Sequence, residues 1–204
     1  MRYFATLLVC IWATCLPAQQ PTPTYTASTK TNDHIGSIEE ETEWSLGCSS
    51  IYCAVNYQIV VSSEVAHPED AYGANSLKDF DLTSPWIAQK GIGEFFEYTV
   101  TERNRPQNKP NLGFTEFYIF SGHRKNMALW NTYARPKKLK MFVNDQLFAY
   151  INLSNTYKQQ TVKLAPIGLS GKKTVVKFEI MEVYAGKKPA VAIAEIAFDG
   201  IGIF

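Results

Sequence analysis

Residues 94–100 are the stretch that most restricts what this chain can fold into. Their sequence, EFFEYTV, places Phe96, Tyr98 and Val100 on one face of an extended backbone. A period of two is typical of a β-strand with one well-buried side. Just upstream, Trp86 follows a proline, in a segment whose backbone is biased towards extended conformations. We interpret this tryptophan as a core residue.

Further stretches of the same kind follow along the chain. Together with residues 94–100, they predict about eight short strands, at 57–63, 114–121, 136–144, 146–153, 158–164, 173–184 and 192–198. Asn144 and Asp145 are residues that tolerate the positive φ angles of a tight hairpin. Helical periodicity is confined to one turn near 126–133. The pattern predicts an all-β sandwich or jelly roll.

The N-terminal part of the chain differs in composition from the predicted strands. Residues 1–18 combine one arginine, a short apolar run and a small residue, which predicts a secretory signal peptide. Lipoprotein anchoring at Cys15 is the competing interpretation. Residues 19–43 are rich in Thr, Pro and Glu and predict a flexible linker. Residues 44–204 then form one domain, and no stretch has the roughly twenty apolar residues of a transmembrane helix.

Two cysteines open the predicted domain. Cys48 and Cys53 are separated by four residues in a chain that carries an export signal, and we therefore expect them to form a disulfide. A zinc site is the alternative. It would need four Cys or His ligands at paired spacings, and only His67 and His123 remain in the domain.

Charge and motifs argue against several function classes. The chain has 20 Lys and Arg against 19 Asp and Glu, so its net charge of +1 does not favour a nucleic-acid partner. Gly91 and Gly93 lack the third glycine of a dinucleotide-binding fingerprint, and there is no phosphate loop or nucleophile elbow. A glycosidase needs two carboxylates at a fixed separation, and any protein of this size has Asp and Glu residues that could form such a pair, so their presence does not identify one. We therefore expect a protein that is not an enzyme.

One loop combines planar aromatic rings with forked hydrogen-bond donors. Residues 121–135 supply the candidates for a glycan-binding site, namely His123, Arg124, Asn126, Trp130, Tyr133 and Arg135. Sugar rings stack on aromatic faces through C–H groups, and their hydroxyls pair with Arg, Asn and His. The alternative is that this loop packs on its own sandwich, with Trp130 buried and Arg135 holding backbone carbonyls.

Three segments carry a resemblance to a known family. Residues 79–100, 121–145 (SGHRKNMALWNTYARPKKLKMFVND) and 183–200 (VYAGKKPAVAIAEIAFDG) resemble the discoidin-like, coagulation factor five/eight type C domain. They are most similar to its NAD-glycohydrolase-type glycan-binding branch in secreted bacterial proteins. The resemblance implies a galactose-binding-like jelly roll, glycan binding, and a structural calcium held by Asp79, Asp81, Ser84 and Glu195. In NAD glycohydrolases, this kind of domain accompanies a separate catalytic domain.

The expected function is a secreted or periplasmic, non-catalytic module that binds carbohydrate at or outside the cell surface. The alternative is a protein-interaction or structural module, for example one that docks on a cell-surface protein. A hydrolase acting on glycans or NAD is the least favoured interpretation.

Overall fold

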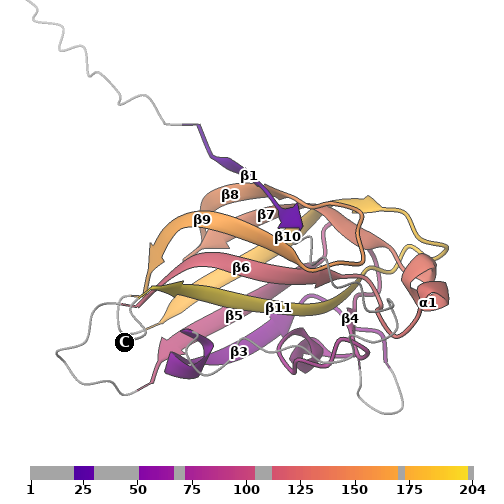
Figure 1. Cartoon of the computed structure of the whole chain (residues 1–204), viewed down its shortest axis with the longest axis horizontal. Helices are drawn as coiled ribbons and strands as arrows, with labels where there is room; N and C mark the ends of the chain where they lie inside the picture. The colour runs from indigo at the N-terminus through magenta and orange to yellow at the C-terminus, as the bar shows by residue number, and fades with distance from the viewer. Residues whose placement is uncertain (1–20, 30–50, 67–71, 104–111, 170–172, 202–204) are drawn as a thin grey trace, which may run out of the picture.

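The chain folds into two β-sheets packed face to face (Figure 1). The computed structural model describes residues 21–29, 51–66, 72–103, 112–169 and 173–201. Their eleven strands confirm the predicted all-β sandwich, with three more strands than the roughly eight expected. Cys48 and the side chain of Cys53, like residues 1–18, lie outside the described part of the chain. The disulfide and the signal peptide therefore remain predictions.

One layer is a six-stranded sheet. In spatial order it contains β1 (Thr24–Thr26), β8 (Gln146–Asn152), β7 (Arg135–Val143), β10 (Thr174–Tyr184), β5 (Phe95–Glu102) and β3 (Val55–Val61). The turn between β7 and β8 is the predicted hairpin, because Asn144 and Asp145 both have positive φ, at 49° and 64°.

The other layer is a five-stranded sheet. Its spatial order is β2 (Ser28–Thr29), β9 (Gln160–Gly168), β6 (Gly113–Ser121), β11 (Ala192–Ile201) and β4 (Trp86–Ile87). Three short helices complete the described elements: η1 (Ile51–Ala54), η2 (Ala74–Leu77) and α1 (Met127–Thr132).

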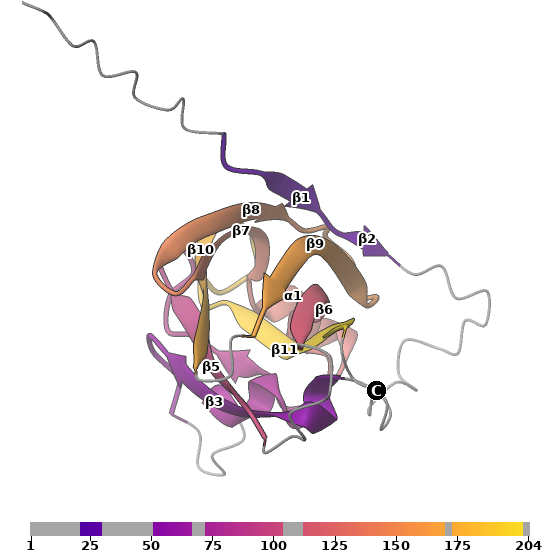
Figure 2. The ribbon, with the colours of Figure 1, turned by 90° about the vertical axis from the view of Figure 1, so that its left-hand side faces the viewer.

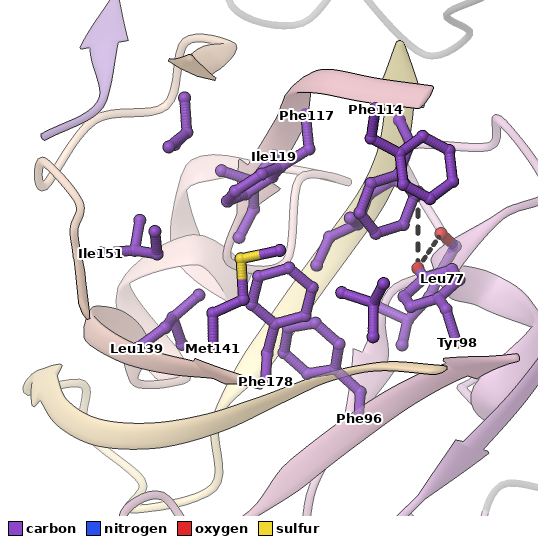
Figure 3. Packing of buried hydrophobic residues seen from close by; sticks show 14 of the residues in the cluster. Leu77, Phe96, Tyr98, Phe114, Phe117, Ile119, Leu139, Met141, Ile151 and Phe178 are labelled. Atoms are coloured by element: carbon purple, nitrogen blue, oxygen red, sulfur yellow. Dashed lines mark hydrogen bonds between the residues drawn. The ribbon is translucent and has the colours of Figure 1, made fainter. Parts of the chain in front are cut away.

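The core lies between the sheets and is rich in aromatic rings (Figure 3). Phe96, Tyr98 and Val100 are all buried, which confirms the predicted inner face of β5. Phe96 stacks on Phe178 of the neighbouring strand β10 at 5.0 Å between ring centroids. The Tyr98 hydroxyl donates a hydrogen bond to the Leu77 carbonyl at 2.9 Å, so its one polar atom is satisfied inside the core.

Trp86 is fully buried, as predicted. Its ring lies 5.7 Å from that of Phe96, and its indole N–H donates to the Ser63 carbonyl at 2.9 Å. Burial of a large apolar side chain of this kind contributes about 1.5–3 kcal/mol to stability. The tryptophan therefore fixes the approach to β5 rather than offering a surface to a ligand.

The N-terminal segment differs from the prediction of a flexible linker over residues 19–43. Residues 24–29 form β1 and β2, which lie along the open edges of the two sheets (Figure 2). β1 pairs in parallel with β8, and β2 pairs antiparallel with β9. Ala27, between them, donates its N–H to the Asn152 carbonyl at 2.9 Å. The segment is ordered because free sheet edges offer backbone partners that its composition does not reveal.

Candidate functional site

Three loops meet at the end of the sandwich that carries α1, on the right in Figure 1. Residues 122–134 follow β6, residues 153–159 follow β8, and residues 185–190 follow β10. We call this surface the three-loop end. Loops carried by a rigid sandwich are common positions for binding residues, so this end is the candidate binding site.

The first of these loops is shaped by local hydrogen bonds. Asn126 is the N-cap of α1, and its side-chain oxygen accepts a bond from the Leu129 N–H at 2.9 Å. Before the helix, Gly122 has φ +82°, and a Cβ at this position would come within 2.7 Å of the Trp130 ring. Only glycine meets both requirements. Trp130 is thereby held against the turn that leaves β6.

The buried side chain of Arg135 is hydrogen-bonded to all three loops. Its guanidinium donates to the carbonyls of Trp130 and Tyr133 at 2.8 and 2.9 Å. The same group also donates to the Asn155 side chain at 2.9 Å and to the Ala185 carbonyl at 3.2 Å. Burial lowers the pKa of Arg135 from its ordinary value. A planar fork with five donors suits this task, because one side chain reaches all three loops.

Arg124 has a similar internal position. Its guanidinium lies over the rings of Phe120 and Tyr157, at 4.7 and 4.5 Å from their centroids. The Tyr157 hydroxyl donates a hydrogen bond to the Arg124 carbonyl. These contacts attach the loop 153–159 to the loop 122–134 through cation–π stacking and one backbone bond.

The loop 185–190 covers the C-terminal end of α1. The N–H groups of Lys187 and Lys188 donate to the carbonyls of Asn131 and Thr132, at 3.2 and 2.7 Å. Gly186 makes this approach possible, because a Cβ there would lie 2.3 Å from the Tyr133 carbonyl carbon. The last turn of α1 and the loop 185–190 therefore form one continuous surface.

Tyr133 is half-buried at the edge of this surface. Its ring stacks on the buried imidazole of His123 at 5.7 Å, and the Lys188 amine lies 5.5 Å from its centroid. The Nδ1 atom of His123 accepts a weak hydrogen bond from the Lys125 N–H at 3.5 Å. Burial, followed by the charge of Lys125, lowers the pKa of His123 to about 4. His123 is therefore neutral at physiological pH.

The six predicted glycan-binding residues do not form a common exposed surface. Four of them are buried, with exposed fractions of 1% for His123, 4% for Arg124, 8% for Trp130 and 5% for Arg135. The interpretation in which the loop packs on its own sandwich holds for these four side chains, because aromatic rings pack against both guanidinium groups and carbonyls accept hydrogen bonds from that of Arg135. Asn126 is exposed and Tyr133 is half-buried, so only these two keep surface for a ligand.

Sequence reasoning missed several exposed residues at the same end. Asn155, Lys187 and Lys188 lie beside the predicted loop and present polar side chains to solvent. Asn155 and the two lysines lie in separate loops, so the density of polar and aromatic residues in one stretch could not identify them. Turn-rich composition between predicted strands was the one available signal.

The predicted calcium residues do come together. Ser84 donates its hydroxyl to Asp81 at 3.0 Å and to Asp79 at 3.4 Å. Glu195, on β11, accepts a bond from the Phe80 N–H at 2.7 Å. Phe80 has φ +64°, a conformation that is uncommon for residues other than glycine. The acidic loop, residues 79–84, therefore lies against the carboxylate of Glu195, a residue more than one hundred positions later in the sequence.

Electrostatics distinguish the three carboxyl groups of this cluster. Burial, reinforced by the charges of Asp79 and Asp81, raises the pKa of Glu195 to about 9. Burial also raises the pKa of Asp79. At Asp81 burial acts in the same direction, but hydrogen bonds from Thr83 and Ser84 outweigh it and lower the pKa. A metal-free site would therefore keep Glu195 protonated at neutral pH.

The oxygen atoms of this cluster are ligands of the type that calcium prefers, but there are too few of them to complete its coordination. The Oε1 atom of Glu195 is buried and has no hydrogen-bond partner among the described residues. Asp79, Asp81 and Ser84 add further oxygens, which is the donor type that calcium prefers. Within the described ranges, however, no three Asp, Glu, His or Cys side chains converge as a metal site. Backbone carbonyls would have to supply the remaining ligands.

Several solved carbohydrate-binding domains share the fold of this chain. The chain has the fold of the CBM32-1 and CBM32-2 domains of Clostridium perfringens ZmpB, solved in complex with GalNAc (TM-score 0.55, 13% identity). That match covers 91% of this chain and 42% of the ZmpB chain, so this chain spans less than half of it. The C. perfringens domain CpGH89CBM32-5, solved with GalNAc-β-1,3-galactose, matches 71% of this chain and 95% of its own (TM-score 0.51, 14% identity).

The family follows from the sequence itself. The family model of the NAD glycohydrolase translocation F5/8 type C domain matches residues 51–199. The chain therefore belongs to this family, which confirms the predicted discoidin-like class. No curated protein matches the sequence. Among the described residues, no helix is long and apolar enough to cross a bilayer.

Proposed function

We propose that this chain is a non-catalytic carbohydrate-binding module that acts outside the cell. The observation that carries the proposal is the three-loop end, where Arg135 holds three loops in one arrangement beneath exposed polar side chains. Preorganised loops lose little entropy when they bind, which matters for a small ligand. The shared fold with domains solved in complex with GalNAc supports the same proposal.

The contact residues of this proposal are those that the structure leaves accessible. Asn126 and Asn131 are exposed and offer amide donors and acceptors for sugar hydroxyls. Tyr133 offers the accessible part of its ring to the C–H face of a sugar. Lys188 lies beside that ring. A single shallow site of this size has an affinity on the order of 0.1 to 1 mM, so biological effect requires several copies.

A glycan array followed by titration with the best saccharide tests this proposal. Asn131→Ala and Tyr133→Ala should each weaken binding about tenfold, while Lys163→Ala, an exposed site on β9, should not. Melting temperatures separate loss of contact from loss of fold. A silent array, or titrations in which the loop variants match the wild type, would contradict the proposal.

A protein-interaction module remains the second candidate. Burial of Arg124, Trp130 and Arg135 favours it, because the loop then has a structural role whatever the ligand. A silent array together with a tight, saturable protein partner would establish this alternative.

We also propose that the acidic loop holds a structural calcium. The supporting observation is the buried Oε1 atom of Glu195, which lacks a hydrogen-bond partner among the described residues. Glu195, Asp79, Asp81 and Ser84 would bind the ion through oxygen. Its role would be to neutralise a carboxylate that the fold buries.

A further inference from the structure

Positive charge is concentrated at the three-loop end. The segments 122–134, 153–159 and 185–190 contain no Asp or Glu, although the whole chain has nearly equal numbers of acidic and basic residues. Their basic residues are Arg124, Lys125, Lys158, Lys187 and Lys188. Because the three segments are hydrogen-bonded to one another, these residues lie at the same end of the sandwich.

The lysines are accessible, whereas the arginines below them are buried. Lys125, Lys158, Lys187 and Lys188 are all exposed. None of them forms an ion pair with a carboxylate of the described residues; the pair between Lys137 and Glu182, at 2.8 Å, lies elsewhere, on β7 and β10. Their charge is therefore available to a ligand.

Acidic side chains outside the three loops have hydrogen-bond partners of their own. Asp81 is close enough to Lys125 for the lysine to lower its pKa, so Lys125 lies at the border with the acidic loop. Glu64 accepts a hydrogen bond from the Ala74 N–H at 3.2 Å. Glu94 is buried and accepts bonds from the Ser62 hydroxyl and the Lys90 N–H.

We propose that the saccharide bound at this end is anionic, carrying a carboxylate or a sulfate ester. The inference rests on the proposed carbohydrate-binding function and adds the chemical class of the ligand. Lys187 and Lys188 would contact the anionic group, since an ammonium is a compact point charge with three donors. Asn126 and Asn131 would pair with the hydroxyls. Concentrated positive charge also raises the rate at which an anionic ligand is captured.

An anionic membrane would be attracted by the same lysines, but the rest of the surface favours a sugar. Among the described residues of the three loops, Met127 is the one large hydrophobic side chain that is exposed. Exposed amides surround it instead of further apolar residues. Insertion into an acyl boundary needs a larger apolar face than this.

Titration of the whole protein with 3′-sialyllactose, galactose 6-sulfate and lactose, at 50 and 500 mM NaCl, tests the inference. We expect at least one of the two anionic saccharides to bind more tightly than lactose and to weaken several-fold at high salt. K187Q/K188Q should weaken its binding roughly three- to tenfold, and should weaken lactose binding by a clearly smaller factor. K163Q/K173Q, which removes two exposed lysines outside the three loops, one on β9 and one just before β10, is the matched control.

The outcomes separate the two proposals. Preference for the sialylated or the sulfated probe identifies the anionic group. Lactose bound as tightly as either anion, without salt dependence, overturns this inference and leaves the proposed function intact. Binding of none of these probes and of no saccharide on an array overturns the proposed function itself. Capture by phosphatidylserine vesicles in place of saccharides also overturns the inference.

Discussion

The guanidinium of Arg135 lies flat over the Trp130 ring, 4.1 Å from its centroid, and donates to the carbonyl of the same residue at 2.8 Å. Both side chains were candidates for contact with a sugar, yet both are buried inside the protein. From this position the same guanidinium also bonds to Asn155 and Ala185 in the other two loops. The pair therefore determines the shape of the three-loop end from within.

Arg135→Ala should destabilise the protein by about 3 to 5 kcal/mol, because it leaves the carbonyls of Trp130, Tyr133 and Ala185 without this donor. Arg135→Lys should recover only part of this loss, since one ammonium cannot reproduce a planar fork. Urea unfolding measures both effects. Lys137→Ala, at an exposed position two residues along β7, is the control and should leave the unfolding midpoint almost unchanged. Equal stability of the Lys and Ala variants would contradict the role of the planar guanidinium in joining the three loops.

His123 makes stability depend on pH. Its pKa is about 4 in the folded protein, against about 6.5 in an unfolded chain. The unfolded state therefore takes up the proton first, and stability present above pH 6.5 is lost as the pH falls towards 4. Protonation also removes the Nδ1 acceptor used by the Lys125 N–H.

His123→Asn removes this titration and keeps an acceptor near the Nδ1 position. The difference in unfolding free energy between pH 7.5 and pH 4.5 should be smaller in the variant, by on the order of 2 kcal/mol. Urea unfolding at the two pH values gives this number. The same pH dependence in variant and wild type would show that His123 is not responsible.

Calcium should raise the melting temperature of the wild-type protein relative to excess chelator. Glu195→Gln should abolish this rise without lowering the melting temperature in chelator, because glutamine resembles the protonated carboxyl that the metal-free fold favours. Glu116→Gln, on the outer part of β6, is the control and should keep the response. An identical melting temperature in calcium and chelator would show that the site is absent.

The N-terminal strands should be released by Ala27→Pro. Proline removes the N–H that bonds to the Asn152 carbonyl, so β1 and β2 lose a central attachment. Hydrogen exchange should accelerate at Tyr150, whose N–H donates to the Pro23 carbonyl, and at Ala165, whose N–H donates to the Tyr25 hydroxyl. Ala27→Ser keeps the N–H and should leave both amides protected. Unchanged protection in the proline variant would contradict the attachment.

The sandwich could be predicted because its longer strands alternate buried apolar residues with outward-facing ones. Phe96 and Tyr98, or Val176 and Phe178, alternate with outward-facing residues, and burial confirms each pair. The strands β1 and β2 could not be predicted in this way. β1 is three residues long and β2 is two, and backbone bonds to sheet edges hold them rather than an apolar face.

The candidate site was predictable in place but not in its contacts. The loop containing Trp130 does lie at a sandwich end, but Arg124 and Arg135 are buried because aromatic rings and carbonyls replace their water. Charged residues are exposed in most proteins, so composition favours the opposite conclusion. Glu195 was placed beside Asp79 through family resemblance, since no local pattern links positions so far apart.

Amide chemical-shift mapping by NMR, with GalNAc and 3′-sialyllactose as titrants, tests the central claim most directly. The account predicts saturable shifts, for at least one sugar, at Asn126, Asn131, Tyr133 and Lys188. Amides at the opposite end, such as Asn144 and Asp145, should not move. Shifts confined to other surfaces, or no shift at millimolar sugar, would contradict a carbohydrate site at the three-loop end.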